Sequence, residues 1–155
     1  MLSKFKIPVY RPDLSGNEKK YVNECLDTSW ISSRGSFVSK FEENFSDYID
    51  VAKATSVSNG TVALHLALHA LGIGKGDEVI VPSLTYVASA NAITYVGATP
   101  VFADSSLEDW NLDTDSVISK ITPKTRAILA VHLYGNPCDM DCLLYTSDAA
   151  DDIPG

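Results

Sequence analysis

The sequence predicts an α/β fold, with a mostly parallel sheet covered by helices on both faces. From Lys53 onward, short apolar runs of strand type alternate with longer segments of helical periodicity. Strands that alternate with helices join through right-handed crossovers, and the helices then cover both faces of the sheet. The length of 155 residues and the apolar fraction of 45% suffice for one domain with its own core.

The N-terminal part predicts an extended start and two amphipathic helices. Ser15 and Glu18 have the spacing of a capping box ahead of a helix from about Asn17 to Asp27. After the polar segment 28–35, apolar residues recur at helical spacing and predict a second helix: Phe37, Val38, Phe41, Phe45 and Tyr48. Both helices are interpreted as packing elements.

The elements of the sheet follow in order. A short strand is predicted over 54–57, and the turn Ser58-Asn59-Gly60 leads into an apolar helix over 61–71 that ends at a series of glycines. The later elements are a strand over 78–81, a helix over 85–96, a strand over 99–103, a helix over 115–120 and a strand over 125–133.

The C-terminal stretch does not continue this pattern. From about Cys142 the sequence offers no further strand, and the run 143–152 resembles translated sequencing-adapter sequence. Residues 1–141 are therefore predicted to form the domain part, and residues 142–155 a non-native or disordered tail.

Composition excludes several classes of function. A net charge of −8 argues against general binding to nucleic acid or to anionic membranes. No apolar run reaches the roughly 18 residues of a membrane helix, and the first residues lack a signal-peptide pattern. Three cysteines without metal-ligand spacing favour reduced thiols and a cytoplasmic location, and no metal site is expected.

Three segments carry candidate site residues. Gly60 and Thr61 open a helix after a strand, where free amides, a close backbone approach and a hydroxyl suit a phosphate; a plain helix cap is an equal alternative. Tyr86 follows the next strand and can lie against a flat heteroaromatic ring, or can be a core aromatic. His132 ends a third strand as a possible donor, or as a structural histidine. Walker and G-x-G-x-x-G motifs are absent, which makes an independent nucleotide-binding domain a weak alternative.

Four stretches together resemble one known family. They are VPSLTYVASANAITYVGATPVFAD (81–104), WISSRGSFVSKFEENFSDYI (30–49), SVSNGTVALHLALHALGIGKGDEVIVP (56–82) and ITPKTRAILAVHLYGNPCDMD (121–141). They resemble the PLP-dependent sugar-nucleotide aminotransferases of the DegT/StrS type, and the opening residues resemble the perosamine synthase-like branch. The resemblance covers about residues 7–141.

The resemblance implies the N-terminal part of the large domain of fold type I, the aspartate-aminotransferase type. It implies pyridoxal 5′-phosphate as cofactor and transfer of an amino group, usually from glutamate, to a nucleotide-linked 4-keto-sugar for polysaccharide synthesis. By position, Gly60 and Thr61 match the phosphate turn, Tyr86 matches the aromatic residue on the pyridine ring, and His132 lies on the strand end that faces the cofactor. A homodimer is implied for the full-length protein.

The resemblance also implies what this chain lacks. The aspartate that pairs with the pyridine nitrogen and the lysine that forms the Schiff base lie beyond residue 141, as does the small C-terminal domain. No catalytic residue is therefore expected here, and the chain alone is expected to be inactive. The alternative is a non-catalytic binding or regulatory protein with the same fold.

Overall fold

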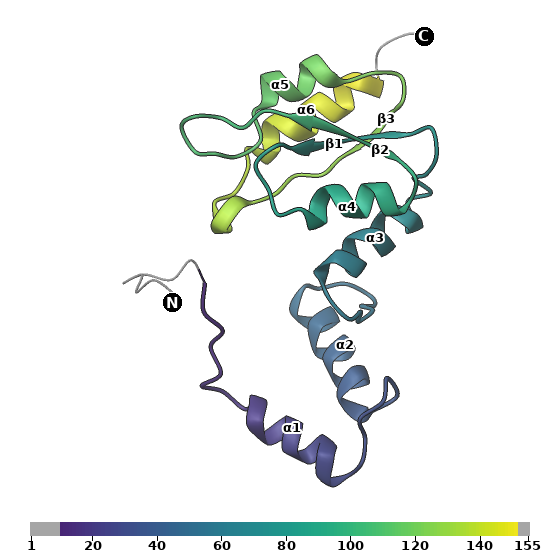
Figure 1. Cartoon of the computed structure of the whole chain (residues 1–155), viewed down its shortest axis with the longest axis vertical. Helices are drawn as coiled ribbons and strands as arrows, with labels where there is room; N and C mark the ends of the chain where they lie inside the picture. The colour runs from purple at the N-terminus through teal and green to yellow at the C-terminus, as the bar shows by residue number, and fades with distance from the viewer. Residues whose placement is uncertain (1–9, 152–155) are drawn as a thin grey trace, which may run out of the picture. The chain divides into compact units, whose positions relative to one another are not determined.

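The structure is a computed structural model that describes the backbone of residues 10–151 and the side chains of residues 10–146. The chain divides into two compact units, residues 1–56 and 57–155. Figure 1 labels the helices and strands of both units.

The first unit contains the two predicted helices, α1 (Glu18–Asp27) and α2 (Ser36–Tyr48). Their existence confirms the amphipathic pattern. The predicted capping box is wrong, because Asn17 occupies the N-cap position without a side-chain bond. The backbone N–H of Ser15 instead donates to Asp13 Oδ1 at 3.0 Å, so Ser15 belongs to a turn that precedes the helix.

Residues 54–57 do not form the predicted strand. A strand needs a neighbour to accept and donate its ladder of hydrogen bonds, and no described segment pairs with this one. The backbone N–H and the hydroxyl of Ser56 both donate to Glu42 Oε1 at 2.8 Å instead. A carboxylate of α2 therefore holds this segment.

The second unit contains a three-stranded sheet in the order β2-β1-β3, with both pairings parallel. Its strands are β1 (Glu78–Pro82), β2 (Thr99–Ala103) and β3 (Thr125–Ile128). The predicted parallel sheet is confirmed. β3 ends five residues earlier than expected, although the N–H of Leu129 still donates to Ile80 O at 2.8 Å.

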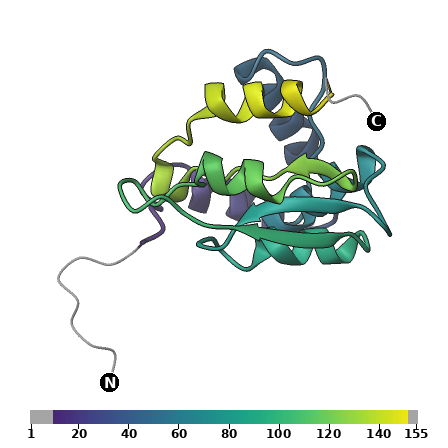
Figure 2. The same cartoon turned by 90° about the horizontal axis from the view of Figure 1, so that it is seen from above.

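Helices cover both faces of this sheet (Figures 1 and 2). Two of them, α3 (Gly60–Ala70) and α4 (Ala88–Tyr95), pack on one face, while α5 (Thr114–Lys120) and α6 (Met140–Asp151) pack on the other. The central strand supplies both cores in alternation. Val79 and Val81 belong to the cluster under α3 and α4, and Ile80 belongs to the cluster under α5 and α6.

Helix α6 continues across the boundary predicted at residue 142. Its Leu143 is 4% exposed within the second cluster. Residues 152–155 lie outside the described residues. A helix across the boundary does not reveal the origin of the sequence, so the non-native tail stays a prediction.

A glycine ends α3 and turns the chain toward β1. Gly72 has a φ of 74° and donates its N–H to His69 O at 3.0 Å, while Ile73 donates to Leu68 O at 3.1 Å. This is the Schellman arrangement, in which a left-handed residue favours glycine. Ile73 and Leu68 are both buried in the first cluster, so the turn also adds to the core.

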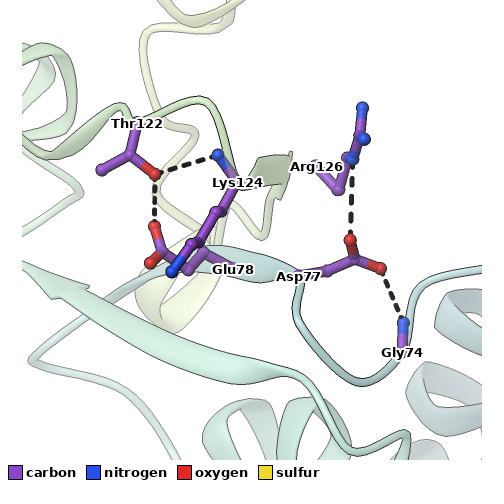
Figure 3. A network of polar contacts seen from close by, with 6 residues as sticks. All are labelled: Gly74, Asp77, Glu78, Thr122, Lys124 and Arg126. Carbon is purple, nitrogen blue, oxygen red and sulfur yellow. Dashed lines mark hydrogen bonds and ion pairs between the residues drawn. The ribbon is translucent and has the colours of Figure 1, made fainter.

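Polar contacts join the turns at the amino edge of the sheet (Figure 3). Asp77 accepts the N–H of Gly74 at 2.9 Å and pairs with Arg126 Nε at 3.6 Å. Thr122 donates its hydroxyl to Glu78 Oε2 at 2.6 Å and accepts the N–H of Lys124. These contacts connect the turn before β1 with the turn before β3.

The pairing of β1 with β3 is irregular at this same edge. Glu78 pairs with Thr125 and Val79 pairs with Ala127, so Arg126 is an extra residue on β3. Such a bulge leaves one residue unpaired and interrupts the alternation of side chains. Arg126 is exposed and points toward Asp77.

The bond between Glu42 and Ser56 predicts an acid-sensitive contact. The backbone N–H of Ser56, and then its hydroxyl, hold the pKa of the Glu42 carboxyl below its ordinary value. A lowered pKa stabilises the folded state above the ordinary pKa, and this stabilisation is lost as the pH falls through the lowered value. We expect the amide resonance of Ser56 to titrate with a pKa lower than that of an unperturbed glutamate, as measured by NMR.

In Glu42→Gln this titration should disappear, while Glu43→Gln on the same helix should leave it unchanged. A Ser56 resonance that titrates in the same way in Glu42→Gln contradicts the assignment.

Candidate cofactor site

The topology places the three candidate segments on the carboxyl side of the sheet. Helix α3 leads into β1, and helix α4 connects β1 to its parallel neighbour β2. Both helices pack on the same face of the sheet and run antiparallel to the strands. Their N-termini therefore lie toward the carboxyl ends of the strands. Ligands in open α/β sheets bind at this edge, where neighbouring strands send their connections to opposite faces. β1 and β3 form such a pair, because β1 leads to α4 and β3 leads to α6.

Gly60 and Thr61 form the first turn of α3. The side chain of Asn59 caps the helix, with Oδ1 accepting the N–H of Val62 at 3.0 Å. The N–H groups of Gly60 and Thr61, and the Thr61 hydroxyl, have no partner among residues 10–146. A Cβ atom at Gly60 would meet nothing within 4 Å. A helix cap and a phosphate site are thus compatible here, because Asn59 satisfies one amide and leaves two.

Tyr86 lies in the connection from β1 to α4. Its side chain is 78% exposed, so it does not belong to the apolar core of the described residues. Its carbonyl accepts the N–H of Ser89 at 3.0 Å, and the Thr85 and Ser89 hydroxyls lie 3.0 Å apart. These contacts delay the start of α4 to Ala88, three residues later than predicted, and fix the backbone that carries the ring.

His132 follows β3 at the same edge. Ile80 pairs with Ile128, so Pro82 at the end of β1 is level with Ala130, and His132 lies two residues further. Its Nδ1 accepts the backbone N–H of Cys138 at 3.0 Å. In the neutral imidazole the proton then lies on Nε2, which is a donor. The side chain of His132 is exposed, so this donor is available to a ligand.

The thiol of Cys142 follows the His132 segment in the chain and is disfavoured as a nucleophile. The thiol of Cys142 has a raised pKa, first because of its hydrogen bond with Asp139 and then because of the negative charge of that residue. A raised pKa lowers the fraction of thiolate, which is the nucleophilic form.

Residues 10–146 contain no group of three or more metal-ligating side chains. No described helix is long and apolar enough to cross a membrane.

The donors at this edge fit pyridoxal 5′-phosphate in part. Two free amides at a helix N-terminus suit a phosphate dianion, an exposed tyrosine ring suits a flat pyridine, and an imidazole N–H suits an oxygen substituent. None of the nine lysines of the chain lies in the segments 57–61, 83–87 or 129–138 that form this edge. These segments thus offer non-covalent contacts for the cofactor and no amine to bind its aldehyde.

Sequence patterns do not single out Asn111, which is buried behind the His132 segment at 2% exposure. Besides contacts within its own loop, its side chain bonds residues 22 and 26 positions later in the chain. Hydrophobic periodicity does not reveal contacts between residues so far apart in the chain. The sequence offers only one hint of burial, which is that Asn111 stands between two large apolar residues, Trp110 and Leu112.

The fold and the carboxyl-edge donors are compatible with one class of protein, the PLP-dependent aminotransferases, and comparison with known proteins identifies this class. The sequence profile of the DegT/DnrJ/EryC1/StrS aminotransferase family matches residues 12–151, and the chain belongs to this family. Members of the family are PLP-dependent. The expected family, fold type and cofactor class are thereby confirmed.

Individual relatives support the assignment to this family. GDP-perosamine synthase of Escherichia coli O157:H7 is 63% identical over 135 residues, which are 87% of this chain and 37% of that protein. An aminotransferase structure from Psychrobacter cryohalolentis matches with a TM-score of 0.83 and 38% identity, over 90% of this chain and 36% of its own. NtdA of Bacillus subtilis, with the cofactor PMP bound, matches with a TM-score of 0.79 and 32% identity, over 86% and 30%. This chain spans about a third of the length of these relatives.

The free hydroxyl of Thr61 leads to a binding prediction. Pyridoxine 5′-phosphate carries the ring and phosphate of the cofactor but no aldehyde, so it does not react with surface lysines. A hydrogen bond to a charged group contributes about 1.5–3 kcal/mol. Thr61→Val is therefore expected to weaken binding about tenfold or more, as measured by ³¹P NMR titration.

Thr94→Val is the matched control, because Thr94 bonds within its own helix to Asn91 O. Equal affinities for the wild-type chain and the Thr61 variant mean that this hydroxyl does not contact the phosphate.

Proposed function

We propose that this chain forms the phosphate-binding and ring-binding part of an aminotransferase that transfers an amino group from glutamate to a GDP-linked 4-keto-sugar for surface polysaccharide synthesis. The identity of 63% to a GDP-perosamine synthase carries this proposal, and two further synthases with that name are 58% and 55% identical. GDP follows from the names of these relatives, and the amino donor follows from the family.

Each candidate residue has a role in this proposal. The amides of Gly60 and Thr61 and the Thr61 hydroxyl hold the phosphate. The ring of Tyr86 lies against the pyridine and excludes water from one of its faces. The Nε2–H of His132 donates to an oxygen of the bound group. When bound, pyridoxal phosphate supplies an electron sink for the amino transfer.

We place the full-length protein in the cytoplasm as a homodimer that binds neither membrane nor nucleic acid. The charge of −8 on this chain supports the last two points for the part of the protein that it contains. Large apolar side chains exposed in the first unit support burial against another surface: Tyr21, Val22, Leu26, Trp30, Ile31, Phe41, Phe45 and Tyr48. Oligomeric mass in solution is the corresponding measurement.

The rival function is a non-catalytic protein of the same fold. Both functions predict binding of the phosphate and the ring. They differ in whether the protein that contains this chain provides an amine to bind the cofactor aldehyde.

The test compares the 155-residue chain with a gene product of the relatives' full length. Each is mixed with pyridoxal phosphate, glutamate and a GDP-linked 4-keto-sugar, and 2-oxoglutarate is measured. We expect no turnover from the 155-residue chain, because its carboxyl-edge segments carry no lysine. Turnover is expected from a gene product of the relatives' full length, with a visible absorbance band of lysine-linked cofactor.

A full-length product that binds the cofactor without this band and without turnover supports the rival. Turnover by the 155-residue chain contradicts the inference that none of its lysines binds the cofactor aldehyde. Turnover with dTDP-linked and not GDP-linked sugars contradicts the choice of nucleotide.

A further inference from the structure

The loop from β2 to α5 presents one buried amide to the segment that carries His132. Asn111 is 2% exposed, and its own backbone is held on both sides. Its N–H donates to Asp109 Oδ1 at 3.1 Å, and its carbonyl accepts the N–H of Ser106 at 2.9 Å. A buried amide held in this way has a defined direction for its side chain.

The carboxamide of Asn111 contacts two points of the later segment. Its Nδ2 donates to Pro137 O at 3.0 Å, and its Oδ1 accepts the N–H of Leu133 at 3.3 Å. A third bond, from Nδ2 to Asp109 Oδ2 at 3.2 Å, ties it back to its own loop. Both the donor and the acceptor capacity of the amide are thus in use.

These two residues lie within the loop 132–138, which the bond that orients His132 closes. The imidazole Nδ1 accepts the N–H of Cys138, and Leu133 and Pro137 are the next residues inward from each end. Between them the chain passes through left-handed conformations at Tyr134 (φ 51°) and Gly135 (φ 85°). A left-handed tyrosine is an unfavourable conformation that surrounding contacts must hold.

We propose that Asn111 is a positioning residue, whose carboxamide holds residues 132–138 closed so that His132 keeps its proton on Nε2 and presents that N–H at the carboxyl edge. The ligand that this donor serves rests on the proposed function. The geometry that sets the tautomer does not, since every contact in it lies within the chain. Asn111 itself touches no ligand in this proposal.

The test reads the tautomer of His132 directly. Two-bond ¹H–¹⁵N NMR spectra of the 155-residue chain, without cofactor, distinguish a protonated ring nitrogen from an unprotonated one by their separate ¹⁵N shifts. Wild-type His132 is expected to show a protonated Nε2 and an unprotonated Nδ1. A wild-type spectrum with the proton on Nδ1 overturns the proposal without any variant.

Two variants separate position from fold. Asn111→Asp keeps an acceptor for Leu133 but cannot donate to Pro137, and Asn111→Ala loses both contacts. In each, the two ring ¹⁵N shifts are expected to move toward one another as the tautomers mix. Asn136→Ala is the control, because Asn136 lies in the same segment but is exposed, and its side chain makes only a 3.4 Å bond to Asp109 O. Amide resonances of β1 report whether a variant remains folded.

Unchanged His132 shifts in a folded Asn111 variant overturn the proposal, as does an equal change in Asn136→Ala. Pyridoxine phosphate affinity is measured in parallel. If the Asn111 variants lose the single tautomer and the wild-type chain does not bind pyridoxine phosphate, the positioning role is supported and the proposed function is contradicted. Ligand binding by the wild-type chain together with unchanged shifts in the variants supports the proposed function and contradicts the positioning role.

Discussion

Strand β1 is the constraint on which the second unit depends. Val79, Ile80 and Val81 are each 0% exposed, and successive side chains point to opposite faces. One five-residue strand therefore supplies the centre of both apolar clusters and pairs with both other strands. Each fully buried aliphatic side chain contributes about 1.5–3 kcal/mol to the stability of the folded state. Truncation of side chains along β1 would leave cavities in both apolar clusters.

The two ends of this sheet differ in what their polar groups do. At the amino edge, side-chain groups of Asp77, Glu78 and Thr122 are paired within the chain, and they tie the turn before β1 to the turn before β3. At the carboxyl edge, the amides of Gly60 and Thr61 and the ring of Tyr86 remain available. This division suits a binding site. Because the contacts at the amino edge already order the sheet, ligand binding at the carboxyl edge does not have to pay the entropy of ordering it.

Local patterns predicted most of the elements, since the apolar runs around β1 and α3 report burial directly. The strand over 54–57 was wrong because a strand exists only when another segment pairs with it. The capping box at Ser15 was wrong because Asp13, two residues away, offers a competing acceptor. The carboxyl-edge placement of Tyr86 and His132 follows from strand order alone. The role of Asn111 does not, because it depends on bonds across 22 and 26 residues.

The bulge at Arg126 decides more than the geometry of one turn. If β3 paired with β1 without this extra residue, Arg126 would lie opposite Val79, with its guanidinium directed into the apolar layer that Ala127 now joins. Every later residue of β3 would exchange faces as well. Ala127 and Leu129 would then leave the apolar cluster under α3 and α4, and Ile128 would leave the cluster under α5 and α6. The apolar layer that each later side chain of β3 joins is thus set by one unpaired residue at the start of the strand.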